Sequence, residues 1–126
     1  MIEVVCNGKR EDELSLEEFD QALTRFEQHE RFEVWLTASS GQSICMLRNG
    51  ADAWLMYLLE AGDPGYRTQG DAESSGMVAF TLANGQEDEY PRSWCIDLEQ
   101  CYQVLFYFFV NDGKRPEWVS WVACDE

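Results

Sequence analysis

Residues 77–94 read MVAFTLANGQEDEYPRSW, and this stretch decides how the rest of the chain is arranged. Two segments typical of strands, Met77–Ala83 and Gln86–Tyr90, flank the dipeptide Asn84-Gly85. Asn-Gly readily adopts the left-handed backbone angles of a tight primed turn. The stretch therefore predicts a β-hairpin.

The second arm of this hairpin carries three consecutive acids, Glu87, Asp88 and Glu89, followed by Tyr90 and Pro91. Neighbouring side chains of a strand point to opposite faces. Three consecutive acids can therefore all be exposed to solvent only if the strand lies at an edge or is bulged. Proline cannot donate a ladder hydrogen bond, which also favours an edge. We expect an acidic, aromatic rim here with a binding function near it. The alternative is a solvated edge that deters aggregation.

The composition indicates one acidic globular domain, residues 1–126. A chain of 126 residues can bury a core, and 45% hydrophobic residues argue against disorder. The 24 Asp and Glu residues outnumber 9 Lys and Arg, which gives a formal net charge of −15. This charge repels nucleic acid and anionic membranes and attracts basic surfaces, although acidity can also serve solubility alone.

The cellular location is predicted from the lack of targeting and membrane-spanning segments in the sequence. The N-terminus MIEVVCNGKR has no long apolar core behind basic residues, so we expect no secretory signal. No apolar run approaches the ~18–20 residues of a membrane span. The five cysteines form no C-x-x-C pair, which argues against zinc-ribbon and thioredoxin motifs. We expect a cytoplasmic protein with reduced cysteines.

The N-terminal half predicts one helix among short strands. Ser15 and Glu18 form a capping box, and apolar residues at helical spacing extend the helix over residues 16–29. Strands are expected at Ile2–Cys6, Phe32–Thr37, Ser43–Leu47 and Asp52–Leu59. A buried helix competes for the last of these, but Trp54, Tyr57 and the bracketing turns favour a strand.

The C-terminal half predicts a second helix over residues 98–111, with Asp97 and Gln100 as its capping pair and Gly113 after its end. The other expected elements are a strand at Tyr66–Thr68, a polar loop at 70–76, a segment Trp94–Ile96 that completes the sheet, and a last strand at Trp118–Val122. The order β-α-β-β-β-β-β-β-α-β predicts an α+β fold in which a mostly antiparallel sheet is covered by two helices.

Several of these stretches resemble the Imm-one immunity proteins of bacterial polymorphic toxin systems. They are GADAWLMYLLEAGDPGYRTQG, AFTLANGQEDEYPRSWCIDLEQCYQVLFYFF and GKRPEWVSW. The family marks fall on Gly62, Asp63, Tyr66, Asn84, Gly85, Gln86, Glu89, Tyr90, Pro91, the helix from Asp97, Arg115, Pro116, Glu117 and Trp121. The resemblance covers residues 44–121, and the N-terminal third matches in pattern only.

The resemblance implies an inhibitor that is made beside a toxin and binds it in the cytoplasm. Many family members are paired with nucleic-acid deaminase toxins and others with nucleases. The composition fits this independently, because a toxin that acts on DNA or RNA needs a basic groove that an acidic domain can occupy. We expect a basic toxin domain as the partner in a 1:1 complex, without direct nucleic-acid or membrane binding.

The residues expected to bind the toxin are acids and tyrosines on or near the hairpin: Glu87, Asp88, Glu89, Tyr90, Asp63, Tyr66, Asp52, Asp71 and Glu73. The tyrosines fit core positions equally well. Trp94, Trp118 and Trp121 are expected in the core, and the acids of the first helix on a solvated face. Arg67 and Arg92 are open to pairing with a toxin carboxylate or, slightly favoured, with this protein's own acids.

Two other functions compete with immunity. The carboxylate trio could hold Mg²⁺ or act as acid and base, but adjacent acids on a strand point apart and no nucleophile–base pair stands out. With His29 as the single histidine, we expect no catalytic residue, metal site or cofactor. A general nucleic-acid mimic that inhibits DNA-binding enzymes suits the charge equally well. Only the motif resemblance favours immunity over it.

Overall fold

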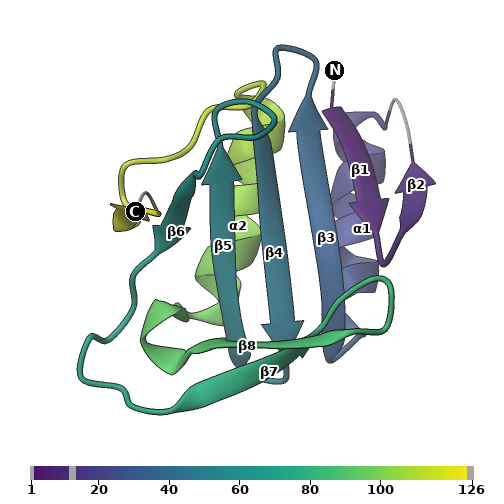
Figure 1. The fold of residues 1–126 in the computed structure, drawn as a ribbon. Coiled ribbons are helices and arrows are strands. Elements are labelled where there is room, and N and C mark those ends of the chain that lie inside the picture. The colour runs from purple at the N-terminus through teal and green to yellow at the C-terminus, as the bar shows by residue number, and fades with distance from the viewer. Residues whose placement is uncertain (1, 12–13, 125–126) are drawn as a thin grey trace.

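An antiparallel seven-stranded sheet forms the centre of the structure, a computed structural model that describes residues 2–11 and 14–124 (Figure 1). Its strands lie in the order β2-β1-β3-β4-β5-β6-β9. Their bounds are β1 (Ile2–Cys6), β2 (Lys9–Glu11), β3 (Arg31–Ala38), β4 (Ser43–Asn49), β5 (Asp52–Leu58), β6 (Tyr66–Thr68) and β9 (Trp121–Ala123). The α+β architecture matches the prediction, and β5 is a strand rather than a helix.

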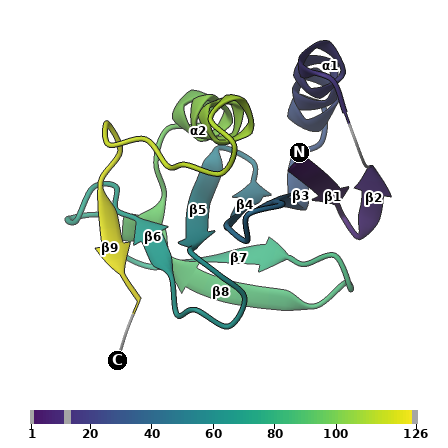
Figure 2. The same ribbon diagram turned by 90° about the horizontal axis from the view of Figure 1, so that it is seen from above.

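Two helices, α1 (Leu16–Glu27) and α2 (Leu98–Val110), cover one face of this sheet (Figure 2). The alternation of β3 places Phe32, Val34 and Leu36 against them, and all three are buried. Phe19 of α1 and Phe108 of α2 are fully buried in the same core. Strand periodicity on one side and helix periodicity on the other thus produce the main core.

The first helix begins as its capping box predicts. The Glu18 amide donates to Ser15 Oγ at 3.1 Å, and the Ser15 amide donates to Glu18 Oε1 at 2.8 Å. For α2 the predicted capping pair is wrong, because Asp97 occupies the N-cap without a side-chain hydrogen bond. At its other end the Gly113 amide (φ 97°) donates to the Phe108 carbonyl at 2.9 Å, as a left-handed helix end requires.

The hairpin, β7 (Met77–Thr81) and β8 (Glu87–Pro91), is a separate two-stranded sheet. It crosses the face of the large sheet that the helices leave open, near one end of β3, β4 and β5 (Figures 1 and 2). The expectation that residues 94–96 complete the sheet is wrong. Arg92–Trp94 form a single 3₁₀ turn, and Ile96 makes one isolated bridge with Ala53.

Two Asn-Gly dipeptides form different turns. Asn7 (φ 50°) and Gly8 (φ 82°) both take left-handed angles and join β1 to β2, a strand that the sequence did not predict. At the hairpin tip Gly85 (φ 89°) is left-handed and Asn84 is not, and the Gly85 amide donates to the Leu82 carbonyl at 2.9 Å. The predicted primed turn is therefore wrong, and this loop is wider.

The C-terminal strand starts later than predicted, because Trp118 lies in the connecting segment with 50% of its surface exposed. The expectation of a core position is wrong for Trp118, whereas Trp121 packs against the main core and donates from Nε1 to the Pro116 carbonyl at 2.9 Å. Within the described residues, no helix combines the length and apolar character needed to cross a bilayer.

One buried hydroxyl ties the sheet to the segment after the hairpin. Thr68 is fully buried, accepts from the Leu55 amide at 3.1 Å and donates to the Trp94 carbonyl at 2.9 Å. Thr68→Val keeps the shape but leaves both backbone groups unpaired, so we expect a loss of unfolding free energy of about 1–3 kcal/mol in urea denaturation. Thr81→Val, on the half-exposed side of β7, is the matched control. Equal stability of the two variants would contradict this role.

Candidate functional site

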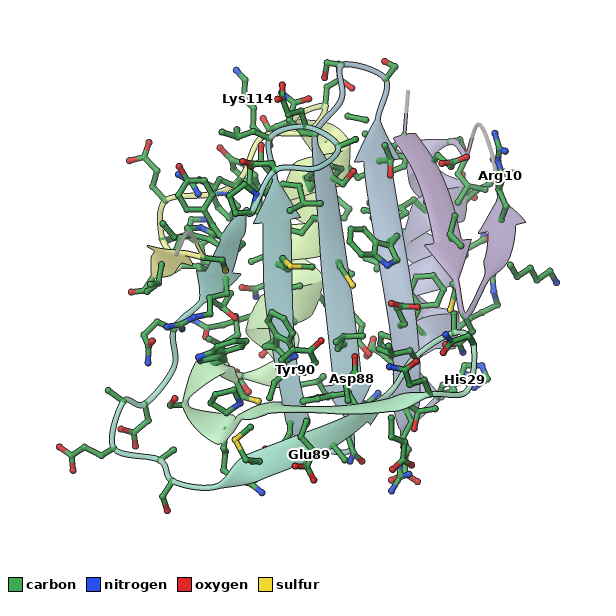
Figure 3. The ribbon with its side chains drawn as sticks, viewed as in Figure 1. Arg10, His29, Asp88, Glu89, Tyr90 and Lys114 are labelled. Atoms are coloured by element: carbon green, nitrogen blue, oxygen red, sulfur yellow. The ribbon has the colours of Figure 1, made fainter. Side chains whose placement is uncertain are left out.

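The hairpin has an inner and an outer face, and its acids divide between them. In the strand register Tyr90 lies opposite Val78 and Asp88 opposite Phe80, and both of these partners are buried. Figure 3 shows Asp88 and Tyr90 on one side of β8 and Glu89 on the other. Glu87 and Glu89 are exposed, whereas Asp88 is half-buried. The alternation of a strand thus separates three consecutive acids, as the sequence argument requires.

The inner face of the hairpin builds a second, aromatic core. Trp54 of β5 packs against Tyr90 and Trp94, with ring centroids 4.8 Å and 5.2 Å away. Phe80 is fully buried in the same cluster. Arg67 places its guanidinium 4.4 Å from the centre of the Trp94 ring and donates to Gln69 Oε1 at 2.9 Å, and it forms no ion pair with an acid among the described residues.

A cleft of about 300 Å³ opens beside β8 on this side of the sheet. Trp35, Cys45 and Met56 of the sheet lie at its base, Tyr90 and Trp94 form one wall, and the loop residue Pro64 contributes from another side. The full lining is Glu33, Trp35, Cys45, Leu47, Trp54, Met56, Pro64, Leu82, Tyr90, Trp94 and Cys124. We call this the aromatic cleft. Its size and apolar lining suit one inserted side chain of a partner.

Backbone and side-chain hydrogen bonds fix the hairpin over the sheet. Asn49 Nδ2 donates to the Ala79 carbonyl at 2.7 Å. Glu33 accepts from the Ala83 amide at 3.0 Å and from Trp35 Nε1 at 3.2 Å, so one carboxylate links the hairpin tip to the base of the aromatic cleft. The cleft is consequently held open by contacts within the protein, before any partner arrives.

Burial raises the pKa of two groups that line the cleft, the Tyr90 hydroxyl and the Cys45 thiol. Desolvation raises the pKa of Tyr90, and the charge of Asp88 raises it further. Burial also raises the pKa of the Cys45 thiol well above its usual value, with a smaller contribution from Glu33. A thiol with a raised pKa is a poor nucleophile. Cys45 therefore lines the cleft as a protonated thiol of low reactivity.

The predicted site residues do not all meet. Glu87, Asp88, Glu89 and Tyr90 share β8, and Asp52 lies next to them because both of its carboxylate oxygens accept from Arg92 Nη1 at 2.9 Å. This ion pair is the pairing with an acid of the same protein that was favoured for Arg92.

The remaining predicted residues are dispersed. Asp63 accepts from the Leu59 amide at 3.0 Å in the turn beside Pro64, and Asp71 accepts from the amide of exposed Glu73 at 2.9 Å. Tyr66 belongs to the helix side of the sheet, where the Arg115 guanidinium lies 3.9 Å from its ring centre. Tyr66 is thus separated from the hairpin by the sheet.

Sequence reasoning missed the base of the aromatic cleft. Trp35 and Glu33 alternate with the buried Phe32, Val34 and Leu36, so their common face was visible in the pattern. The pattern did not show that the hairpin packs on this face, because the hairpin was expected to form the rim of a single sheet. Among the described residues, no group of three or more His, Cys, Asp and Glu side chains is placed to hold a metal ion.

Comparison with known proteins identifies the family. No curated protein matches the chain. The family model described as Immunity protein Imm1 matches residues 7–123, so the match includes the N-terminal third that resembled the family in pattern only. The match spans the hairpin, both helices and every lining residue of the aromatic cleft except Cys124. The chain therefore belongs to the Imm1 family of immunity proteins.

Proposed function

We propose that this immunity protein neutralises a basic, nucleic-acid-acting toxin by binding it in a 1:1 complex in the cytoplasm, with the hairpin and the aromatic cleft covering the toxin's substrate groove. The observation that carries the proposal is the juxtaposition on β8 of outward carboxylates and an apolar cleft. Glu87 and Glu89 face solvent, while Tyr90 of the same strand lines the cleft. A deaminase or a nuclease would present the basic surface that this arrangement fits.

The two parts of this surface have separate roles. Exposed carboxylates on a domain of net charge −15 accelerate the encounter with a basic partner but hold it weakly once bound. An apolar side chain that fills the cleft would contribute about 1.5–3 kcal/mol, the usual value for burying such a group. Binding should therefore be steered by the hairpin acids and retained by the aromatic cleft.

The first experiment is to co-express the chain with the protein encoded beside it, purify through a tag on this chain, and identify the partner by mass. A stoichiometric basic protein that kills cells when expressed alone is expected. Recovery of assorted DNA-binding enzymes instead of one partner would contradict the proposal and favour a general nucleic-acid mimic.

Reversal of the outward hairpin acids should slow association. We expect Glu87→Lys combined with Glu89→Lys to lower the association rate constant about tenfold or more at low salt, because the steering field is locally inverted. The difference should shrink at high salt, where screening shortens the Debye length. Glu60→Lys combined with Glu117→Lys changes two other exposed acids by the same charge and is the control. Equal association rate constants for the two pairs would contradict the placement of the hairpin in the interface.

Truncation within the aromatic cleft should accelerate dissociation. Trp35→Ala removes the largest half-buried side chain at its base, so we expect a loss of binding free energy of about 2 kcal/mol or more, or about 30-fold in Kd. Trp118→Ala makes the same change at a half-exposed site away from the cleft. Thermal unfolding of both variants separates binding from stability, and an unchanged dissociation rate for folded Trp35→Ala would contradict the role of the cleft.

A further inference from the structure

A second concave surface lies between the two helices. The helices cover the face of the sheet opposite the hairpin (Figure 2). The concave surface is a groove of about 690 Å³ between α1 and α2, which we call the interhelical groove. The two helices contact each other through the stacked rings of Phe19 and Phe109, with centroids 4.1 Å apart. The groove runs along residues 20–27 of α1 and 97–106 of α2.

The groove has an apolar component that is partly open to water. Leu23 of α1 and Leu98, Tyr102 and Phe106 of α2 line it. Phe106 leaves 37% of its surface exposed, whereas Cys101, Val104, Leu105 and Phe108 of the same helix are buried. A large ring exposed inside a concave surface is the feature that a docking partner covers.

Four carboxylates border this apolar lining, two from each helix: Asp20, Glu27, Asp97 and Glu99. In the described part of the chain, none of the four side chains forms an ion pair or accepts a hydrogen bond. Asp97 is the clearest case, because it occupies the N-cap of α2 without capping it. Asp20 and Glu27, which the sequence placed on a solvated face, are exposed and border this groove.

The only cation in the lining is already engaged by the protein. Arg48 is 9% exposed, and its Nε donates to the Gly50 carbonyl at 2.8 Å. Its Nη1 donates to the carbonyls of Glu27 and His29 at 3.2 Å and 3.0 Å and to the Tyr102 hydroxyl at 3.3 Å. Four carboxylates therefore border the groove, and its one guanidinium is already hydrogen-bonded within the protein. The negative charge of the groove favours a cationic occupant.

We propose that the interhelical groove binds a lysine- or arginine-rich amphipathic helix of the toxin polypeptide, separate from the part that meets the hairpin. Two antiparallel helices offer a third helix an apolar seam for its hydrophobic stripe and acidic borders for its basic flanks. The groove follows residues 98–106 of α2, a seam of about 13 Å that matches two to three turns of a partner helix. The inference rests on a toxin being the partner, but not on the hairpin covering its substrate groove.

The test compares three pairs of charge reversals in binding to the purified toxin. The groove pair is Asp20→Lys with Glu27→Lys, both exposed on α1 beyond its first turn. The hairpin pair is Glu87→Lys with Glu89→Lys, and the control pair is Glu60→Lys with Glu117→Lys. We expect the Kd of the groove pair to be at least tenfold higher than the Kd of the control pair. Phe106→Ala should raise the Kd by a similar factor. Val110→Ala should leave the Kd unchanged, because Val110 is 51% exposed on the same helix outside the groove.

A peptide probe tests the groove without the toxin. A synthetic peptide of about 14 residues, with leucine and lysine in amphipathic helical order, should bind the wild-type chain and lose binding to Phe106→Ala. A scrambled peptide of the same composition should bind more weakly. If the groove pair and Phe106→Ala match their controls while the hairpin pair weakens binding, the groove inference is wrong and the proposed function stands. If only the groove variants weaken binding, the hairpin placement is wrong and the groove inference stands.

Discussion

The middle of the sheet must be buried on both faces, and the rest of the structure depends on this constraint. In β4 the five residues from Ile44 to Arg48 are all buried, which alternation alone cannot achieve with cover on one side. The helices cover one face and the hairpin covers the other, where Phe80 and Val78 pack on Leu47 and Trp54. The hairpin crosses only one end of the strands, so the face beside it stays partly open as the aromatic cleft.

Local signals predicted the elements, and long-range packing decided their arrangement. The capping box of Ser15 and Glu18 forms as predicted from the sequence, because both of its partners lie within one helical turn. The Asn84-Gly85 turn and the N-cap Asp97 depart from prediction. At the hairpin, the contact between Glu33 and the Ala83 amide ties the loop to β3, which no local rule includes. Strand β2 was missed because Lys9–Glu11 has no apolar pattern, and it exists through pairing with β1.

The site was predictable in its charges and not in its shape. The three acids and Tyr90 were singled out from sequence, and the structure places Glu87 and Glu89 on the outer side of β8 and Asp88 with Tyr90 on the inner side. The base of the cleft comes from β3, β4 and β5, whose side chains meet the hairpin only through the fold. Tyr66 illustrates the converse, because a tyrosine next to the same region in sequence lies on the other face and holds Arg115. Membership of the Imm1 family implies that the protein binds a cognate toxin.

Amide hydrogen exchange of the protein, alone and bound to the toxin encoded beside it, tests the central claim most directly. The account predicts slower exchange on binding in residues 82–96, which include the hairpin tip and the segment that walls the aromatic cleft. Unchanged exchange throughout residues 82–96, with protection confined to other segments of the sheet or helices, would contradict the claim that the hairpin side of the sheet binds the toxin.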